Sequence, residues 1–160
     1  MKPIVLMLIA LCATDARAQG KPNFTGTWQL DILRSRLDPK SDVKSATMKI
    51  DLADPKLKID MNMQTGHGPR AYVLDLRTDG TESQQTIDGQ TCKAVASWGT
   101  ITGERLRLEI TCPSGAGTVV RTREMKLGDK GKMLTTVFVE KDQHGERRSN
   151  EFFTREEGKP

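Results

Sequence analysis

Two arginines in the segment TVVRTREMKL have the residue type and spacing to hold an anionic group inside a folded domain. Arg121 and Arg123 share the period-two alternation of Val119, Met125 and Leu127, so all of these side chains would project from one face of a strand. A guanidinium group presents forked donors that match a carboxylate. The spacing therefore predicts cations on a face that is otherwise apolar.

Two carboxylates, Glu140 and Glu151, fall on the same face in the last two predicted strands. Their placement rests on a two-residue turn at His144-Gly145, which would set these pairs opposite each other: Phe138 and Glu151, Thr136 and Phe153, Leu134 and Arg155. Because an unpaired buried ion costs several kcal/mol, the four charges must pair or meet water. One interpretation is a self-paired ion cluster, or a slip of one residue that turns these side chains outward. The other is a hydrated cavity in which the arginines hold a ligand.

Sequence motifs of the common enzyme classes are missing from the chain. It contains no G-x-S-x-G, no H-E-x-x-H and no phosphate-binding loop. Its two histidines, His67 and His144, lie in turn-like segments. Glu140 and Glu151 could act as a general acid and a general base, but only their spacing supports this role. We therefore expect no catalytic residues, no cofactor and no metal ion.

Alternation of apolar and polar residues with a period of two runs through nearly the whole chain, without sustained helical periodicity. Gly, Asp and Pro separate the alternating runs, as is usual between strands. The predicted strands are 26–33, 46–52, 56–64, 70–77, 81–87, 90–98, 104–112, 118–127, 132–141 and 146–155. Their short connections favour an antiparallel meander in one domain, with residues 34–45 as a longer polar loop.

Glycine-containing turns predict the strand register around two cysteines. Asp79-Gly80 and Asp88-Gly89 suit two-residue hairpin loops, and residues 101–103 suit a three-residue loop with Gly at the left-handed position. The predicted opposite pairs are Leu76 and Ser83, Leu74 and Gln85, Tyr72 and Ile87; Ile87 and Gln90, Gln85 and Cys92, Ser83 and Ala94; Trp98 and Leu106, Ala96 and Leu108, Ala94 and Ile110. The last loop also places Cys92 opposite Cys112, and a disulfide there would stabilise the fold by roughly 3 kcal/mol.

The first eighteen residues have the pattern of a secretory signal peptide. Lys2 precedes an apolar run at residues 4–13, and residues 16–18, Ala-Arg-Ala, suit cleavage. Cleavage would leave residues 19–160 and remove two basic residues and one acidic residue, which lowers the net charge from +4 to +3. The apolar run is too short for a membrane span of about 20 residues. Cleavage would also remove Cys12 and leave Cys92 and Cys112. An even number of cysteines is typical of exported chains, so we expect a periplasmic or secreted protein with no stable membrane anchor. Interspersed charges argue against nucleic acid as a partner.

The two ends of the predicted domain carry related aromatic patterns. The first strand opens on Phe24-x-Gly26-x-Trp28, and the last ends on Phe153-x-Arg155. With about ten antiparallel strands between them, the chain resembles the calycin superfamily of lipocalins, fatty-acid-binding proteins and avidins. It is most similar to small exported lipocalin-like proteins of bacteria. The resemblance implies an all-β, up-and-down barrel in which Trp28 plugs one end, Arg155 covers the indole and Gly26 permits close approach.

The sequence departs from fatty-acid-binding proteins in two respects. Residues 34–45 do not have the pattern of that family's helix–turn–helix lid. Alignment of Phe153 with the family's inward Tyr also puts Glu151 where an Arg holds the fatty-acid carboxylate. Because a carboxylate would repel that head group, the sequence disfavours fatty-acid binding in this form.

We expect a non-catalytic barrel that binds a small, partly apolar ligand, and its arginines suit an anionic group on that ligand. The candidate contacts are Arg121, Arg123 and Tyr72, with Trp98 as a wall. Small barrels either fill their interior or hold a ligand there. The alternative is therefore an interaction protein with a filled barrel, similar to the periplasmic protease inhibitors of the same superfamily.

Overall fold

The computed structural model describes residues 20–100, 103–115 and 117–156. The predicted signal peptide, residues 1–18, lies outside this part of the chain, as do Ile101 and Thr102 of the predicted three-residue loop. Gly103, which ends that loop, has the left-handed φ of 65° that the prediction requires. Within the described ranges, no helix is long and apolar enough to cross a membrane.

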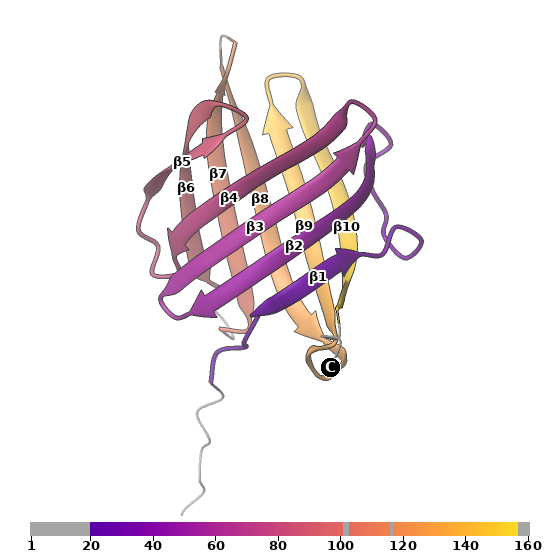
Figure 1. Ribbon diagram of the computed structural model, residues 1–160. Coiled ribbons are helices and arrows are strands. Elements are labelled where there is room, and N and C mark those ends of the chain that lie inside the picture. The colour runs from indigo at the N-terminus through magenta and orange to yellow at the C-terminus, as the bar shows by residue number, and fades with distance from the viewer. Residues whose placement is uncertain (1–19, 101–102, 116, 157–160) are drawn as a thin grey trace, which may run out of the picture.

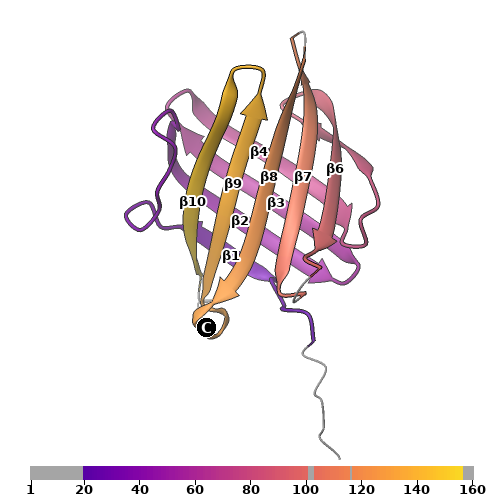
Figure 2. The same ribbon diagram turned by 180° about the vertical axis from the view of Figure 1, so that it is seen from behind.

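The described residues form ten antiparallel strands in one up-and-down sheet, which confirms the predicted fold class. The strands are β1 (Gly26–Leu30), β2 (Val43–Ala53), β3 (Lys56–Thr65), β4 (Gly68–Arg77), β5 (Ser83–Ile87), β6 (Gln90–Trp98), β7 (Arg105–Ser114), β8 (Gly117–Gly128), β9 (Met133–Asp142) and β10 (Gly145–Arg155). A 3-10 turn, η1 (Asp129–Gly131), separates β8 from β9. The sheet order β4-β3-β2-β1-β10-β9-β8-β7-β6-β5 pairs the first strand with the last, so the sheet curls into a nearly closed barrel (Figures 1 and 2).

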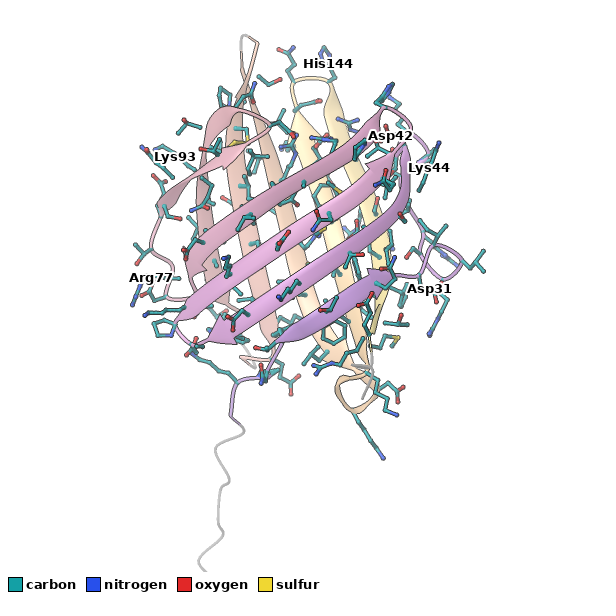
Figure 3. All side chains as sticks on the ribbon, viewed as in Figure 1. Asp31, Asp42, Lys44, Arg77, Lys93 and His144 are labelled. Carbon is teal, nitrogen blue, oxygen red and sulfur yellow. A yellow bond between two sulfur atoms is a disulfide. The ribbon has the colours of Figure 1, made fainter. Side chains whose placement is uncertain are left out.

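Alternating burial along the strands follows from the period-two sequence pattern. On β3, for example, Leu57, Ile59 and Met61 face inward and are each 1% exposed. Charged side chains such as Arg77 and Lys93 project from the outer surface of the barrel (Figure 3). The apolar face of every strand therefore contributes to one core inside the barrel.

The predicted register is confirmed for β5, β6 and β7. All the pairs predicted across the Asp88-Gly89 turn and across the following loop are present. Asp88 and Gly89 both have positive φ, 51° and 77°, as a two-residue hairpin loop of this kind requires. Cys92 and Cys112 lie at the end of the β6–β7 ladder and form a disulfide, with their Cα atoms 4.4 Å apart.

The predicted hairpin at Asp79-Gly80 is wrong, because β4 and β5 do not form a ladder. The chain instead turns toward β6, where Asp79 bridges to Ser97 and the Gly80 N–H donates to the Ala96 carbonyl at 3.0 Å. Long-range contacts hold it there, since the Thr78 N–H donates to the Pro55 carbonyl at 2.9 Å. The three pairs predicted across this turn therefore do not form: Leu76 and Ser83, Leu74 and Gln85, Tyr72 and Ile87.

The seam between β4 and β5 is closed by side chains. The Gln85 side-chain oxygen accepts the Asp75 backbone N–H at 3.0 Å, and its amide nitrogen donates to the Asp75 carbonyl at 2.8 Å. Gln85 thus replaces one backbone pair of the missing ladder. Arg70 on β4 also crosses the seam and donates to Asp88 in the β5–β6 turn.

The predicted register of the last hairpin is wrong by two residues. The turn lies at residues 143–144, one position earlier than predicted, and the observed pairs are Phe138 and Ser149, Thr136 and Glu151, Leu134 and Phe153. Asp142 accounts for the difference, because its Oδ1 accepts the His144 N–H at 2.7 Å and so begins the turn. A shift of two residues keeps every side chain on its predicted face, so Glu140 and Glu151 still face inward.

One end of the barrel contains Trp28, whose indole is fully buried. Its Nε1 donates to the Phe24 carbonyl at 3.0 Å. The guanidinium carbon of Arg155, directly opposite on β10, lies 4.7 Å from the indole centroid. Gly26 lies against both groups, since a Cβ there would be 3.4 Å from Arg155 Cζ and 3.6 Å from Trp28 Nε1.

Candidate ligand-binding cavity

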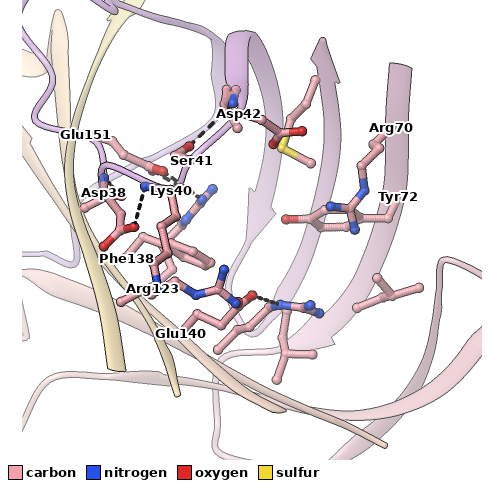
Figure 4. A pocket seen from close by; sticks show the side chains of 17 residues that line it. Asp38, Lys40, Ser41, Asp42, Arg70, Tyr72, Arg123, Phe138, Glu140 and Glu151 are labelled. Carbon is pink, nitrogen blue, oxygen red and sulfur yellow. Dashed lines mark hydrogen bonds and ion pairs between the residues drawn. The ribbon is translucent and has the colours of Figure 1, made fainter. Parts of the chain in front are cut away.

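A cavity of about 200 Å³ lies inside the barrel, between β2–β5 on one side and β7–β10 on the other (Figure 4). It lies toward the end of the barrel away from Trp28, because the β10 residues that line it precede Arg155 on that strand. The lining residues are Asp38, Lys40, Ser41, Asp42, Val43, Met63, Arg70, Tyr72, Ile87, Ile110, Arg121, Arg123, Phe138, Glu140, Arg147, Ser149 and Glu151. Charged and apolar side chains therefore share one interior surface.

Glu140 receives two arginines at the cavity wall. Arg121 Nε donates to Glu140 Oε2 at 2.7 Å, and Arg147 donates to the other carboxylate oxygen. Arg147 also lies 3.7 Å from Asp142. Arg121 Nη1 is 3.7 Å from the sulfur of Cys112. The ion pair and the disulfide therefore hold the Arg121 guanidinium from two sides.

Glu151 and Arg123 form a second, more buried ion pair. Their N–O distance is 3.2 Å, and each side chain is 11% exposed. Thr136 Oγ1 donates to Glu151 at 2.7 Å, and the Arg123 guanidinium lies 5.1 Å from the centroid of the Phe138 ring. The four charges face inward, where they form ion pairs and line a cavity, so the slip of one residue that would turn them outward does not occur.

The segment between β1 and β2 covers one side of the cavity, and residues 38 and 40–42 belong to the lining. Arg36 and Asn150 exchange two backbone hydrogen bonds of 2.8 and 2.9 Å, and the Asp38 N–H donates to Ser149 Oγ at 2.9 Å. β10 therefore anchors this cover. The sequence did not predict these lining residues, because their polar composition indicates only an exposed loop and does not show what the loop covers.

Two β4 residues face the cavity from the side opposite the glutamates. The Tyr72 hydroxyl points toward the cavity (Figure 4), and it has no hydrogen-bond partner among the described residues. Arg70 lines the same wall, and its hydrogen bond to Asp88 raises the pKa of the guanidinium. The wall therefore presents a hydroxyl donor beside permanently charged cations.

The structure brings three of the four predicted contact residues together. Arg121, Arg123 and Tyr72 all line the cavity, and Trp98 does not. Trp98 lies near the opposite end, where its ring centroid is 6.0 Å from that of Phe24 and its Nε1 donates to an Asp54 oxygen at 2.9 Å. Among the described residues, no three His, Cys, Asp or Glu side chains are grouped so that they could hold a metal ion.

Comparison with known proteins identifies the fold. No protein-family model and no curated protein matches the chain in sequence. The zebrafish ileal bile acid-binding protein, solved in complex with cholic acid, has a similar structure, with a TM-score of 0.50 and 13% sequence identity. The similarity covers 83% of this chain and 98% of the zebrafish chain. At this identity the similarity shows the fold alone, a nearly closed antiparallel β-barrel.

Proposed function

We propose that this protein is a non-catalytic binding protein that holds a small, partly apolar ligand with an anionic group inside its barrel. The observation that carries the proposal is the cavity of about 200 Å³ whose wall brings Arg121, Arg123 and Tyr72 together. This cavity supports ligand binding over the alternative of an interaction protein with a filled barrel. The zebrafish protein, solved in complex with cholic acid, supports small-molecule binding as a use of this fold.

The charge of the cavity wall favours an anion over a cation. The lining contains five cationic side chains, at positions 40, 70, 121, 123 and 147, and four carboxylates, at positions 38, 42, 140 and 151. Lys40 makes no ion pair within the described residues, so it remains available to a ligand. Guanidinium groups bind carboxylates through two parallel hydrogen bonds, which adds geometric specificity to the attraction.

The apolar part of the lining fits the hydrocarbon part of such a ligand. It consists of Val43, Met63, Ile87, Ile110 and Phe138. Ligand pockets in proteins commonly combine apolar walls with a few oriented polar groups. The ligand would therefore be amphipathic, with its charged group at the arginines and its hydrocarbon part against this surface.

Export is part of the proposal. The pattern of residues 1–18 supports removal of a signal peptide, which would leave residues 19–160 as one barrel domain in the periplasm or outside the cell. The disulfide between Cys92 and Cys112 fits an oxidising compartment. Mass spectrometry of the protein from its source tests this directly, and a retained Met1 would contradict it.

Native mass spectrometry of protein purified from its source tests the binding function. We expect a non-covalent adduct of low mass that dissociates on activation and carries an acidic group. The affinity of that molecule should fall in Arg121→Ala and Arg123→Ala. Arg107→Ala is the matched control, because Arg107 is exposed on the outside of β7 and its loss changes the net charge equally. Unchanged affinity in both cavity variants would reject the anion-binding role.

A further inference from the structure

A layer of side chains divides the barrel interior into two compartments. Tyr72, Arg121, Arg123, Phe138 and Ile110 line the cavity of about 200 Å³ and also a second hollow of about 30 Å³. Since the same residues line both spaces, they form the floor of the larger one and the roof of the smaller one. We call these five residues the arginine layer.

The compartment beyond the arginine layer is nearly filled. Apart from Thr122, its other walls are apolar and at most 3% exposed, and they consist of Met48, Ile59, Met61, Leu74 and Leu108. A volume of about 30 Å³ leaves room for only about two water molecules. A ligand in the larger cavity therefore cannot extend deeper without displacing the layer and its ion pairs.

We propose that the ligand is a small organic acid whose hydrocarbon part is one short acyl chain or one ring. This inference rests on the proposed function and adds a size limit to it. A cavity of about 200 Å³ is smaller than the roughly 300–1,000 Å³ that is usual for pockets of drug-sized ligands. A long-chain fatty acid or a steroid acid is larger than an acid with one short chain or one ring and would not be enclosed in that space.

The arrangement of the lining also fixes the orientation of such an acid. Its carboxylate lies on the arginine layer, where Arg121 and Arg123 supply guanidinium donors and Tyr72 supplies a hydroxyl donor. Its hydrocarbon part lies between the layer and the cover formed by residues 38–42. A longer chain would protrude past this cover or break the Arg123–Glu151 ion pair, and each excess methylene would then reduce affinity.

Isothermal titration calorimetry with residues 19–160, the disulfide formed, tests the size limit. The probes are butanoate, hexanoate, octanoate, benzoate, hexadecanoate and cholate, each below its critical micelle concentration. We expect hexanoate or benzoate to bind at least about tenfold more tightly than hexadecanoate or cholate, since a methylene that does not fit costs about tenfold or more. Equal or tighter binding of the two large acids would overturn the inference.

A variant that opens the arginine layer tests the cause of the limit. Phe138→Ala removes a ring that lines both compartments, so the preferred chain length should increase toward octanoate or longer. Val139→Ala is the matched control, because Val139 is the next residue of β9 and faces outward, opposite Thr122. An unchanged preference in a folded Phe138→Ala variant would show that the layer does not set the limit, and would overturn the inference.

The outcomes separate the size limit from the proposed function. Tight binding of hexadecanoate or cholate leaves a ligand-binding barrel and rejects only the small acid. A neutral or cationic adduct in native mass spectrometry likewise retains interior binding and rejects the acid. Absence of both an adduct and any titration heat rejects the proposed function together with the inference.

Discussion

Trp28 and Arg155 lie directly opposite each other on β1 and β10, with the guanidinium carbon 4.7 Å from the indole centroid. The Arg155 Nε atom is buried and has no hydrogen-bond partner among the described residues. The face of the indole therefore replaces a hydrogen bond as the main partner of that part of the guanidinium. This pair joins the first strand to the last at one end of the barrel.

Replacement of Arg155 by Ala should destabilise the barrel. The cation–π interaction contributes about 0.5–2 kcal/mol, and the Trp28 ring would also lose its cover. Urea unfolding followed by Trp fluorescence measures the loss. Arg155→Lys keeps a cation and should lose less than Arg155→Ala; equal losses in the two variants would contradict a cation–π contribution.

Removal of the disulfide should lower stability without changing the fold. The bond closes a loop with a sequence separation of 20 residues, for which the chain-entropy model gives about 3 kcal/mol. The double variant Cys92→Ser/Cys112→Ser, compared with the oxidised protein in urea unfolding, checks this. Reduction of the unmodified protein should reproduce the loss, and a reduced protein as stable as the oxidised one would contradict it.

Loss of the Gln85 side chain should open the seam between β4 and β5. Its amide makes two hydrogen bonds to the Asp75 backbone, each of which contributes about 1 kcal/mol. Gln85→Ala should therefore lower the unfolding free energy by about 1–2 kcal/mol and accelerate hydrogen exchange at the Asp75 amide. Gln84→Ala is the control, since Gln84 is exposed on the outer face of the same strand. Equal exchange rates in both variants would show that Gln85 does not hold the seam.

Asp54 should make stability depend on acid pH. Hydrogen bonds from Lys21, Thr78 and Trp98 lower the pKa of Asp54 to about 2. Because the folded pKa lies below the unfolded value, this contribution is complete above the unfolded pKa of about 3.9 and is lost as the pH falls toward 2. Urea unfolding at a series of pH values should show a smaller loss over this range in Asp54→Asn.

A second carboxylate titrates over the same range and provides the comparison. Hydrogen bonds from Thr81 and Arg77 lower the pKa of Asp79 to about 2. The double variant Asp54→Asn/Asp79→Asn should therefore depend on pH less than Asp54→Asn alone. If Asp54→Asn had the same pH profile as the unmodified protein, Asp54 would make no contribution.

Removal of one partner of the Arg123–Glu151 pair should cost more than removal of both. Each side chain is 11% exposed, and leaving one buried charge unpaired costs about 3–5 kcal/mol. Glu151→Ala should show this loss in urea unfolding. The apolar double variant Arg123→Met/Glu151→Leu should recover most of it, because no charge then remains buried. A double variant less stable than Glu151→Ala would contradict this account.

The alternating faces of the candidate site could be predicted from the sequence, because alternation is a property of a single strand. Arg121 and Arg123 face the interior on β8 because they share the period of Val119 and Met125. The predicted inward faces of Glu140 and Glu151 are correct although the predicted β9–β10 register is wrong by two residues, because a shift of two residues preserves the face of every side chain. Trp98 shows the limit: it shares the inward parity but lies at the other end of the barrel.

Turn chemistry alone did not decide which strands pair. Asp88-Gly89 and Asp79-Gly80 have the same residue types, yet only the first joins a hairpin. After Arg77 the chain is held by the carbonyl of Pro55, which is distant in sequence. β4 and β5 are consecutive along the chain, yet they form the two edges of the sheet and meet at a seam bridged by Gln85 instead of a backbone ladder.

The sequence by itself determined the strands, their inward faces and the Cys92–Cys112 pairing, because periodicity and the local turns govern these. Only the tertiary structure decided how the interior is divided. The position of the cavity depends on where along the barrel axis the side chains of β4, β8 and β9 meet. It also depends on the cover, the segment between β1 and β2, which backbone hydrogen bonds attach to β10. Parity places a residue inside the barrel, whereas its height along the barrel axis depends on strand tilt and closure. Strand tilt and barrel closure therefore decide that four side chains meet at the same level along the barrel axis, namely Tyr72, Arg121, Arg123 and Phe138.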